Sequence, residues 1–222
     1  MNRRGGHWFT FAMKERKDEL MKSVLLTGFE PFGGEEVNPS ARVVEKLDGR
    51  FVGGRLVIGT VLPVVFGKSL AMLKLEVRRV QPEWVLCLGQ AGGRAEISLE
   101  RVALNIQDAN MPDNAGNQPV DRPVVRGGPA AYWSTLPIKS VVAAIREAGI
   151  PAGVSESAGT FVCNQVFYGL MWMLEGQRKV RGGFIHVPYL PEQARRLGGG
   201  APSLPLKRMV RGIEIAIETL SG

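Results

Sequence analysis

Histidine is scarce in this chain, so few residues could act as a general acid or base near neutral pH. Only His7 and His186 occur among the 222 residues. An imidazole exchanges protons near neutral pH, so an enzyme that needs a general base there would use one of these two. His7 lies in an N-terminal segment without a clear pattern, whereas His186 ends the apolar run GGFIH. Open α/β sheets place their sites at the carboxyl ends of strands, so His186 is the candidate base, and a structural histidine is the alternative.

The two cysteines lie in different settings. Cys163 lies in SAGTFVCNQVFYGL, where a turn of small residues leads into an apolar helix. A thiol at a helix N-terminus is expected to have a lowered pKa, and the free N–H groups there could hold an oxyanion. Cys163 is therefore a candidate nucleophile, and an inert buried thiol is the alternative. Cys87, in the apolar run WVLCLG, fits the inert alternative better.

Glu100 is a candidate for the group that orients the base. It follows GQAGGRAEISL, and a carboxylate could hold an imidazole and stabilise its charged form. A solvated strand position is the alternative. Other chemistries lack their motifs: GQAGGR is not G-x-G-x-x-G, Leu62 stands where a P-loop before GKS needs glycine, and no G-x-S-x-G occurs.

The elements that must position these residues follow from the apolar pattern. Short apolar runs predict strands at Val24–Leu26, Leu56–Leu62, Trp84–Leu88, Ala152–Ser155 and Gly183–Val187, with a partly alternating edge strand in Ile97–Ile106. Helices are predicted at Pro39–Leu47, Lys68–Val80, Ile138–Ala148, Cys163–Leu174 and Leu206–Leu220. Asn38 is the expected N-cap of the first helix. The alternation predicts an α/β fold with a twisted, mostly parallel sheet covered on both faces.

The chain length accommodates one domain, expected to span residues 21–222. Residues 1–20 show no periodic apolar face and are interpreted as an N-terminal extension that is not native, either a mis-called start or a tag-like addition; an extra helix packed on the domain is the alternative. Residues 107–129 are rich in Asp, Asn, Pro and Gly, and predict a long surface loop of the kind that often has a function.

The charge and the cysteine content limit the partners and the cellular compartment that we expect. The formal net charge is +7, but the Lys and Arg residues are scattered, so we expect no nucleic-acid partner. No spaced Cys and His pattern indicates a metal site. Two unpaired cysteines and the lack of an apolar signal segment favour the cytoplasm, and no run is long enough to span a membrane.

Several stretches taken together resemble the pyroglutamyl peptidase I (pyrrolidone-carboxylate peptidase) family. They appear in the family's order between about residues 22 and 193, and those holding Glu100 and Cys163 are similar to its two active-site signatures. The matching stretches are VLLTGFEPFGG (24–34), VNPS (37–40), GQAGGR (89–94), ERVALN (100–105), PDNAGNQP (112–119), GGPAAYWSTLPIK (127–139), SAGTFVCNQVFYGL (157–170) and GGFIHVPYLPEQ (182–193).

The resemblance implies a cysteine peptidase that removes an N-terminal pyroglutamyl residue from peptides, without cofactor or metal. It implies a triad of Cys163, His186 and Glu100. It also implies a three-layer α/β/α sandwich and a homo-oligomer, often a tetramer. The residues it assigns to the pyroglutamate pocket are Phe29, Phe32, Phe161 and Val162, with Gln90 facing the lactam and Asn38 bracing the region.

Three positions depart from the family pattern, and two other functions remain open. Asn110 stands where many relatives have Arg, Val64 where some have Thr, and Gln165 where many have His. The first departure removes a positive charge that the resemblance would place near the site. A glutamine amidotransferase-like amidase would also use Cys, His and Glu. A basic nucleic-acid-binding module is the third possibility, and it would require a continuous basic face.

Overall fold

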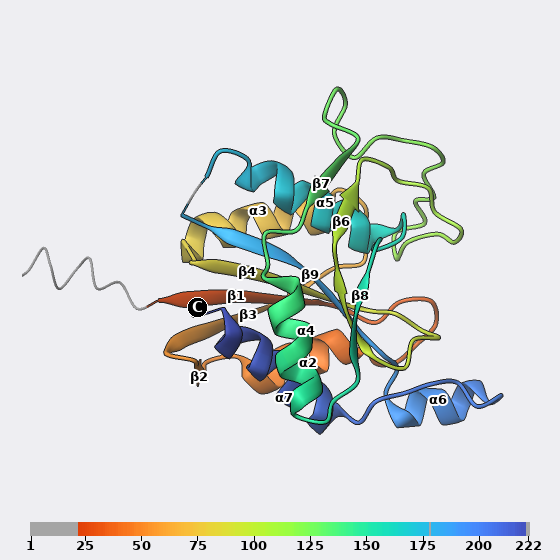
Figure 1. Ribbon diagram of the computed structural model, residues 1–222. Coiled ribbons are helices and arrows are strands. Elements are labelled where there is room, and N and C mark those ends of the chain that lie inside the picture. The colour runs from red at the N-terminus through yellow and green to blue at the C-terminus, as the bar shows by residue number, and fades with distance from the viewer. Residues whose placement is uncertain (1–21, 178, 221–222) are drawn as a thin grey trace, which may run out of the picture.

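The computed structural model describes residues 22–177 and 179–220, so the proposed extension of residues 1–20 lies outside the described residues. The expected α/β fold is confirmed. A seven-stranded sheet has the order β2-β3-β1-β4-β9-β5-β8, and β6 and β7 form a separate pair (Figure 1). The strands are β1 (Ser23–Phe29), β2 (Phe51–Val52), β3 (Arg55–Leu62), β4 (Trp84–Gln90), β5 (Ile97–Glu100), β6 (Val102–Leu104), β7 (Ala131–Trp133), β8 (Ala152–Ser155) and β9 (Arg181–Val187).

The large sheet is mixed. The pairs β1–β3, β1–β4, β4–β9 and β5–β8 are parallel, whereas β2–β3 and β5–β9 are antiparallel. The segment Ile97–Ile106, expected to pair at an edge, forms two strands: β6 is an edge strand paired with β7, but the expectation is wrong for β5, which lies between β9 and β8. Its side chains are buried accordingly. Because β5 runs antiparallel to β9, it approaches the site from the opposite direction to the neighbouring parallel strands.

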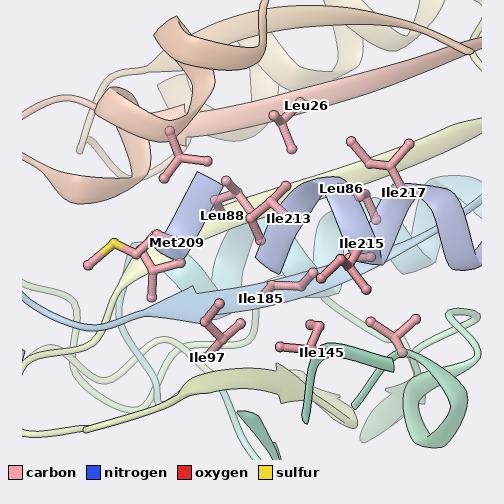
Figure 2. Packing of buried hydrophobic residues seen from close by; sticks show 14 of the residues in the cluster. Leu26, Leu86, Leu88, Ile97, Ile145, Ile185, Met209, Ile213, Ile215 and Ile217 are labelled. Carbon is pink, nitrogen blue, oxygen red and sulfur yellow. The ribbon is translucent and has the colours of Figure 1, made fainter. Parts of the chain in front are cut away.

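Alternate residues of the central strands face two different cores. On one face, Leu86 and Leu88 of β4 and Ile185 of β9 pack against Ile213 of α7 (Figure 2). On the other face, Cys87 and Phe184 pack with α5. The helices are α2 (Pro39–Leu47), α3 (Lys68–Val80), α4 (Ile138–Glu147), α5 (Val162–Leu174), α6 (Pro191–Leu197) and α7 (Leu206–Thr219).

The start of α2 follows directly from its sequence. Asn38 is the N-cap: its side-chain oxygen accepts from the Ser40 N–H at 3.0 Å, and Pro39 occupies the first helical position. The predicted bounds of α2, α3 and β8 agree with the structure, and most other predicted elements differ by a few residues at their ends. The short elements β2, β7 and α6 were not predicted, since they lack a long apolar period.

In the long loop of residues 107–129, one carboxylate both folds the loop on itself and joins it to the segment after β3. Asp113 accepts from the backbone N–H groups of Phe66, Ala115 and Asn117, each at 2.8 Å. Burial opposes ionisation of this group, but its bonds to Asn117, Phe66 and Ala115 hold its pKa below the ordinary value. Within the described residues, no helix is both long enough and apolar enough to cross a bilayer.

Candidate active site

Three neighbouring parallel strands end side by side, and each brings a predicted site residue. β1 ends at Phe29, β4 ends at Gln90, and β9 carries His186 one residue before its end. The strand order β1-β4-β9 makes these ends adjacent. The location agrees with the rule that open α/β sheets hold their sites beyond the carboxyl ends of strands.

Glu100 meets His186 because β5 runs antiparallel to β9. Ser98 is opposite His186 and Glu100 is opposite Phe184, so Glu100 and His186 are diagonal neighbours on one face. Glu100 Oε1 lies 2.7 Å from His186 Nδ1, and both side chains are buried. An ionised carboxylate can only accept, so Nδ1 carries the proton and Nε2 is the free acceptor.

Gly89 locates the thiol relative to this pair. Gly89 is in register with His186 on the adjacent strand β9, and its missing side chain would point to the same face. A Cβ added to Gly89 would lie 2.9 Å from Cys163 Sγ. The thiol therefore occupies the space above Gly89, beside the imidazole, and the structure brings Glu100, His186 and Cys163 together.

The expected lowering of the Cys163 pKa is wrong. Its side chain is half-buried, but the protein around it excludes enough water to raise the pKa of the thiol to about 12, and the negative charge of Glu100 adds to the rise. Cys163 is thus a neutral thiol at neutral pH and needs a base to become a nucleophile. Burial likewise raises the pKa of Cys87 to about 12.

The first turn of α5 supplies hydrogen-bond donors beside the thiol. The N-cap residue Phe161 makes no side-chain hydrogen bond to this turn, and Cys163 is the second residue of the helix. The first N–H groups of a helix have no intrahelical partner. They can therefore stabilise a negative oxygen that forms close to Cys163 Sγ.

Arg94 is a site residue that the sequence analysis missed. Its Nη1 lies 2.7 Å from Glu100 Oε1, the same oxygen that contacts His186. Burial opposes ionisation of Glu100, but His186, Ser155 and Arg94 together hold the pKa of the carboxyl below its ordinary value. The only available signal was the position of Arg94 at the end of GQAGGR, six residues before Glu100.

A small, narrow cavity of about 10 Å³ lies against the thiol. Its walls are mostly aromatic and aliphatic, and the only polar side chains besides the thiol are amides. All six residues that the resemblance assigns to substrate binding line this cavity. Val64, one of the three positions that depart from the family pattern, also lines it. The lining residues are Phe29, Phe32, Asn38, Val64, Gln90, Phe161, Val162 and Cys163.

A larger, more open cavity of about 590 Å³ continues from the other side of the thiol. It shares Phe32, Gln90, Phe161 and Cys163 with the small cavity, so Cys163 lies where the two cavities meet. The rest of its wall consists of polar side chains and of small residues that leave the backbone accessible. Its further lining residues are Ala91, Gly92, Arg94, Asp108, Ala109, Asn110, Ala158, Gly159, Thr160 and His186.

The other two departures lie at different depths. Asn110 is an exposed residue on the wall of the larger cavity. Gln165 is buried and joins two loops: its Oε1 accepts from the Gly67 N–H at 2.8 Å, and its Nε2 donates to Gln107 Oε1. Gln165 is thus a loop-bridging residue. No group of three or more His, Cys, Asp or Glu side chains suited to a metal occurs among residues 22–177 and 179–220.

A thiol, an imidazole and a carboxylate at the carboxyl end of an α/β sheet define the class of cysteine hydrolases. Comparison with known proteins narrows this class. The model of the pyroglutamyl peptidase family matches residues 22–222, and the chain belongs to that family.

Curated relatives and solved structures agree. The chain is 58% identical over 199 residues to a pyrrolidone-carboxylate peptidase of Escherichia fergusonii, covering 90% of this chain and 92% of the relative. It resembles the crystal structure of Bacillus amyloliquefaciens pyroglutamyl peptidase I with a TM-score of 0.87 at 51% identity, covering 90% and 97% of the two chains. A mutant pyrrolidone carboxyl peptidase from Pyrococcus furiosus gives 0.86 at 44% identity, covering 90% and 98%.

Proposed function

We propose that this protein is a cysteine peptidase that removes an N-terminal pyroglutamyl residue from peptides, with Cys163, His186 and Glu100 as its triad. Family membership supports the activity. The observation that carries the residue assignment is the position of Cys163, between a small apolar cavity and a larger open one. The small cavity would take the pyroglutamyl ring once its aromatic walls move apart, because its free volume of about 10 Å³ is too small for a five-membered ring, and the open cavity would take the peptide that leaves.

Acylation begins with a proton transfer, because the resting thiol is neutral. His186 Nε2 takes the proton from Cys163 as Sγ attacks the carbonyl carbon that joins the ring to the next residue. N–H groups in the first turn of α5 stabilise the oxyanion. His186 then gives its proton to the leaving nitrogen, the C–N bond breaks, and a thioester remains on Cys163.

Deacylation uses the same base. A water molecule gives a proton to His186 and attacks the thioester carbon, the C–S bond breaks, and the proton returns to sulfur as free pyroglutamate leaves. Glu100 keeps the proton on Nδ1 throughout and stabilises the positive imidazolium that forms in each half-reaction. Arg94 acts one step further away, by keeping Glu100 ionised.

Specificity for the lactam follows from the chemistry of the small cavity. Pyroglutamate carries a neutral lactam, whereas an N-terminal proline carries an ammonium at neutral pH. Burying an unpaired cation between Phe29 and Phe32 would cost several kcal/mol, and Gln90 would lose its lactam partner. A site built to hydrogen-bond a group can reject an analogue that lacks it by about 10⁴–10⁵.

Matched fluorogenic pyroglutamyl and prolyl amides test the proposal. We expect kcat/KM to differ by at least about a thousandfold, allowing for imperfect pairing. A thiol alkylator should abolish the pyroglutamyl reaction. A difference below roughly tenfold would show that the pocket does not read the lactam, and would favour an amidase of the glutamine-hydrolysing type instead.

The surroundings of the site complete the proposal. We place the enzyme in the cytoplasm, as a homo-oligomer that is a tetramer, with a three-layer α/β/α sandwich as its domain architecture. Free thiols support a reducing compartment, and the exposed apolar side chains of Leu75, Trp133 and Trp172 support self-association. Light scattering on the purified protein should give four times the chain mass.

The nucleic-acid alternative gains no support from the charges. Many of the arginines lie within 4 Å of a carboxylate, which divides the positive surface. These paired residues are Arg42, Arg50, Arg55, Arg79, Arg94, Arg101, Arg196 and Arg211.

A further inference from the structure

Gln193 is a fully buried polar residue outside the proposed triad and pocket. It lies on α6, the short helix that follows β9, and none of its surface is exposed. Both ends of its amide are hydrogen-bonded: Oε1 accepts from the Leu190 N–H at 3.0 Å, and Nε2 faces three oxygens. A buried amide with this many partners is held in one orientation.

The identity of each amide atom of Gln193 follows from partners that have only one possible role. The backbone N–H of Leu190 can only donate, so the atom facing it is Oε1. The backbone carbonyl of Val37 and the carboxylate of Glu35 can only accept, each at 3.2 Å, so the atom facing them is Nε2. The Gln193 amide therefore cannot be flipped without losing all three contacts.

Gln193 transfers this fixed orientation to Gln90. The shortest contact of Gln193 Nε2, at 2.9 Å, is with the Gln90 side chain. The atom opposite a donor must be an acceptor, so it is Gln90 Oε1. Gln90 lines both cavities at the thiol. In the described part of the chain its Nε2 has no protein acceptor, and it is the amide atom left for a ligand.

We propose that Gln193 is a specificity-determining positioning residue: it fixes the Gln90 amide so that an N–H donor, rather than a carbonyl oxygen, meets the lactam carbonyl of the substrate. This inference rests on the proposed function. A freely rotating Gln90 would present oxygen to the lactam carbonyl part of the time, and two acceptors repel. With Oε1 held by Gln193, only the productive orientation remains, which favours binding of the lactam.

Gln193→Glu, assayed at about pH 8 or above so that the new carboxyl beside Glu35 is ionised, is the direct test, because it keeps the side-chain length and the acceptor for Leu190 but removes the donor to Gln90. We expect KM for a pyroglutamyl amide and the inhibition constant of 2-pyrrolidone, the simplest five-membered lactam, each to rise at least about tenfold. The pyroglutamyl-over-prolyl preference should fall by a similar factor. The rate at which iodoacetamide alkylates Cys163 should stay unchanged. Glu192→Gln, at the exposed neighbour on α6, should match the wild type.

A double-variant cycle separates orientation from general loss of structure. In a Gln90→Ala background there is no amide to orient, so Gln193→Glu should change KM by less than about twofold. An effect of equal size in both backgrounds would overturn the inference, as would a normal KM in folded Gln193→Glu. If Gln193→Glu does not fold, Gln193→Ala takes its place in the same cycle. Failure of the wild type to cleave the pyroglutamyl amide at all would instead refute the proposed function.

Discussion

The two cysteines have the same raised pKa but opposite access. Burial brings each thiol to a pKa of about 12, yet only Cys163 lines a cavity, whereas Cys87 has no exposed surface. We therefore expect Cys163→Ala to abolish hydrolysis of a pyroglutamyl amide, and Cys87→Ala to keep most of it. Circular dichroism would verify that both variants fold. Equal loss in the two folded proteins would contradict the assignment of the nucleophile.

The neutral state of the Cys163 thiol makes the base more important. With no preformed thiolate, attack requires proton transfer to His186 in the same step. His186→Gln should lower kcat by about 10²–10⁴-fold without unfolding the protein, since general-base help is typically of that size. Turnover near the wild-type value would place the base elsewhere.

The contribution of Arg94 should be measurable in the pH dependence of kcat. The pKa of Glu100 is lowered in the folded protein, so the ionised, His186-orienting state is fully present above the ordinary carboxyl pKa and is lost as pH falls through the lowered one. Arg94→Gln removes one of the groups that lower this pKa. The acid limb of the pH profile of kcat should move to higher pH in Arg94→Gln. Near pH 8, kcat of Arg94→Gln should fall by less than about 100-fold, which is the smallest decrease expected for His186→Gln.

Two comparisons make the Arg94 experiment specific. Arg94→Lys keeps a positive charge, so its acid limb should lie between those of the wild type and Arg94→Gln. Arg42→Gln removes an exposed arginine that pairs with Glu45 on the surface of α2, and should leave the profile unchanged. An unshifted acid limb in Arg94→Gln would show that Arg94 does not act through Glu100.

At the scale of the elements, Asn38 links the start of α2 to the pocket. Its Oδ1 caps the helix, and its Nδ2 donates to the Glu30 carbonyl at 3.0 Å. Asn38→Ala should lower the free energy of unfolding by about 1 kcal/mol through loss of the cap, and raise KM because the pocket wall loosens. Asn38→Ser keeps a capping oxygen but cannot reach Glu30, so it should restore most of the stability and little of the KM. Chemical denaturation and kinetics on the same samples measure both.

The sequence predicted those elements whose signals are local. Asn38 and Pro39 give the start of α2, and the apolar run from Trp84 gives β4. The direction of β5 could not be predicted, because alternation of apolar residues is the same in parallel and antiparallel strands. That direction is what places Glu100 diagonally opposite His186.

For the candidate site, too, the sequence predicted the residues with a local signal but not those that depend on which elements become neighbours. Similarity to a family supplied the triad and pocket residues, but not Arg94 or Gln193. Both act through another side chain, and such contacts depend on which strands and helices become neighbours. The raised pKa of Cys163 was missed because the position at a helix start is visible in sequence, whereas exclusion of water is not.

At the scale of the whole molecule, the family match begins at residue 22 and β1 at Ser23. We expect a variant that lacks residues 1–20 to fold and to keep its kcat/KM for a pyroglutamyl amide within about twofold, since both the family match and the first strand begin after those residues. Thermal unfolding and kinetics beside the full chain would measure this. An insoluble or inactive shortened protein would show that the extension belongs to the domain.

The position of β9 has a consequence for how the protein is made. Among residues 22–177 and 179–220, β9 is the last strand and the only one that joins the two parts of the large sheet, where it lies between β4 and β5 (Figure 1). While a ribosome has not yet released residues 181–187, the strands β1 to β4 and the pair β5–β8 have no edge in common. Long-range pairing of this kind delays folding until the late segment arrives. A nascent chain should thus acquire hydrolytic activity only near the end of synthesis, when His186 enters between Gly89 and Ser98.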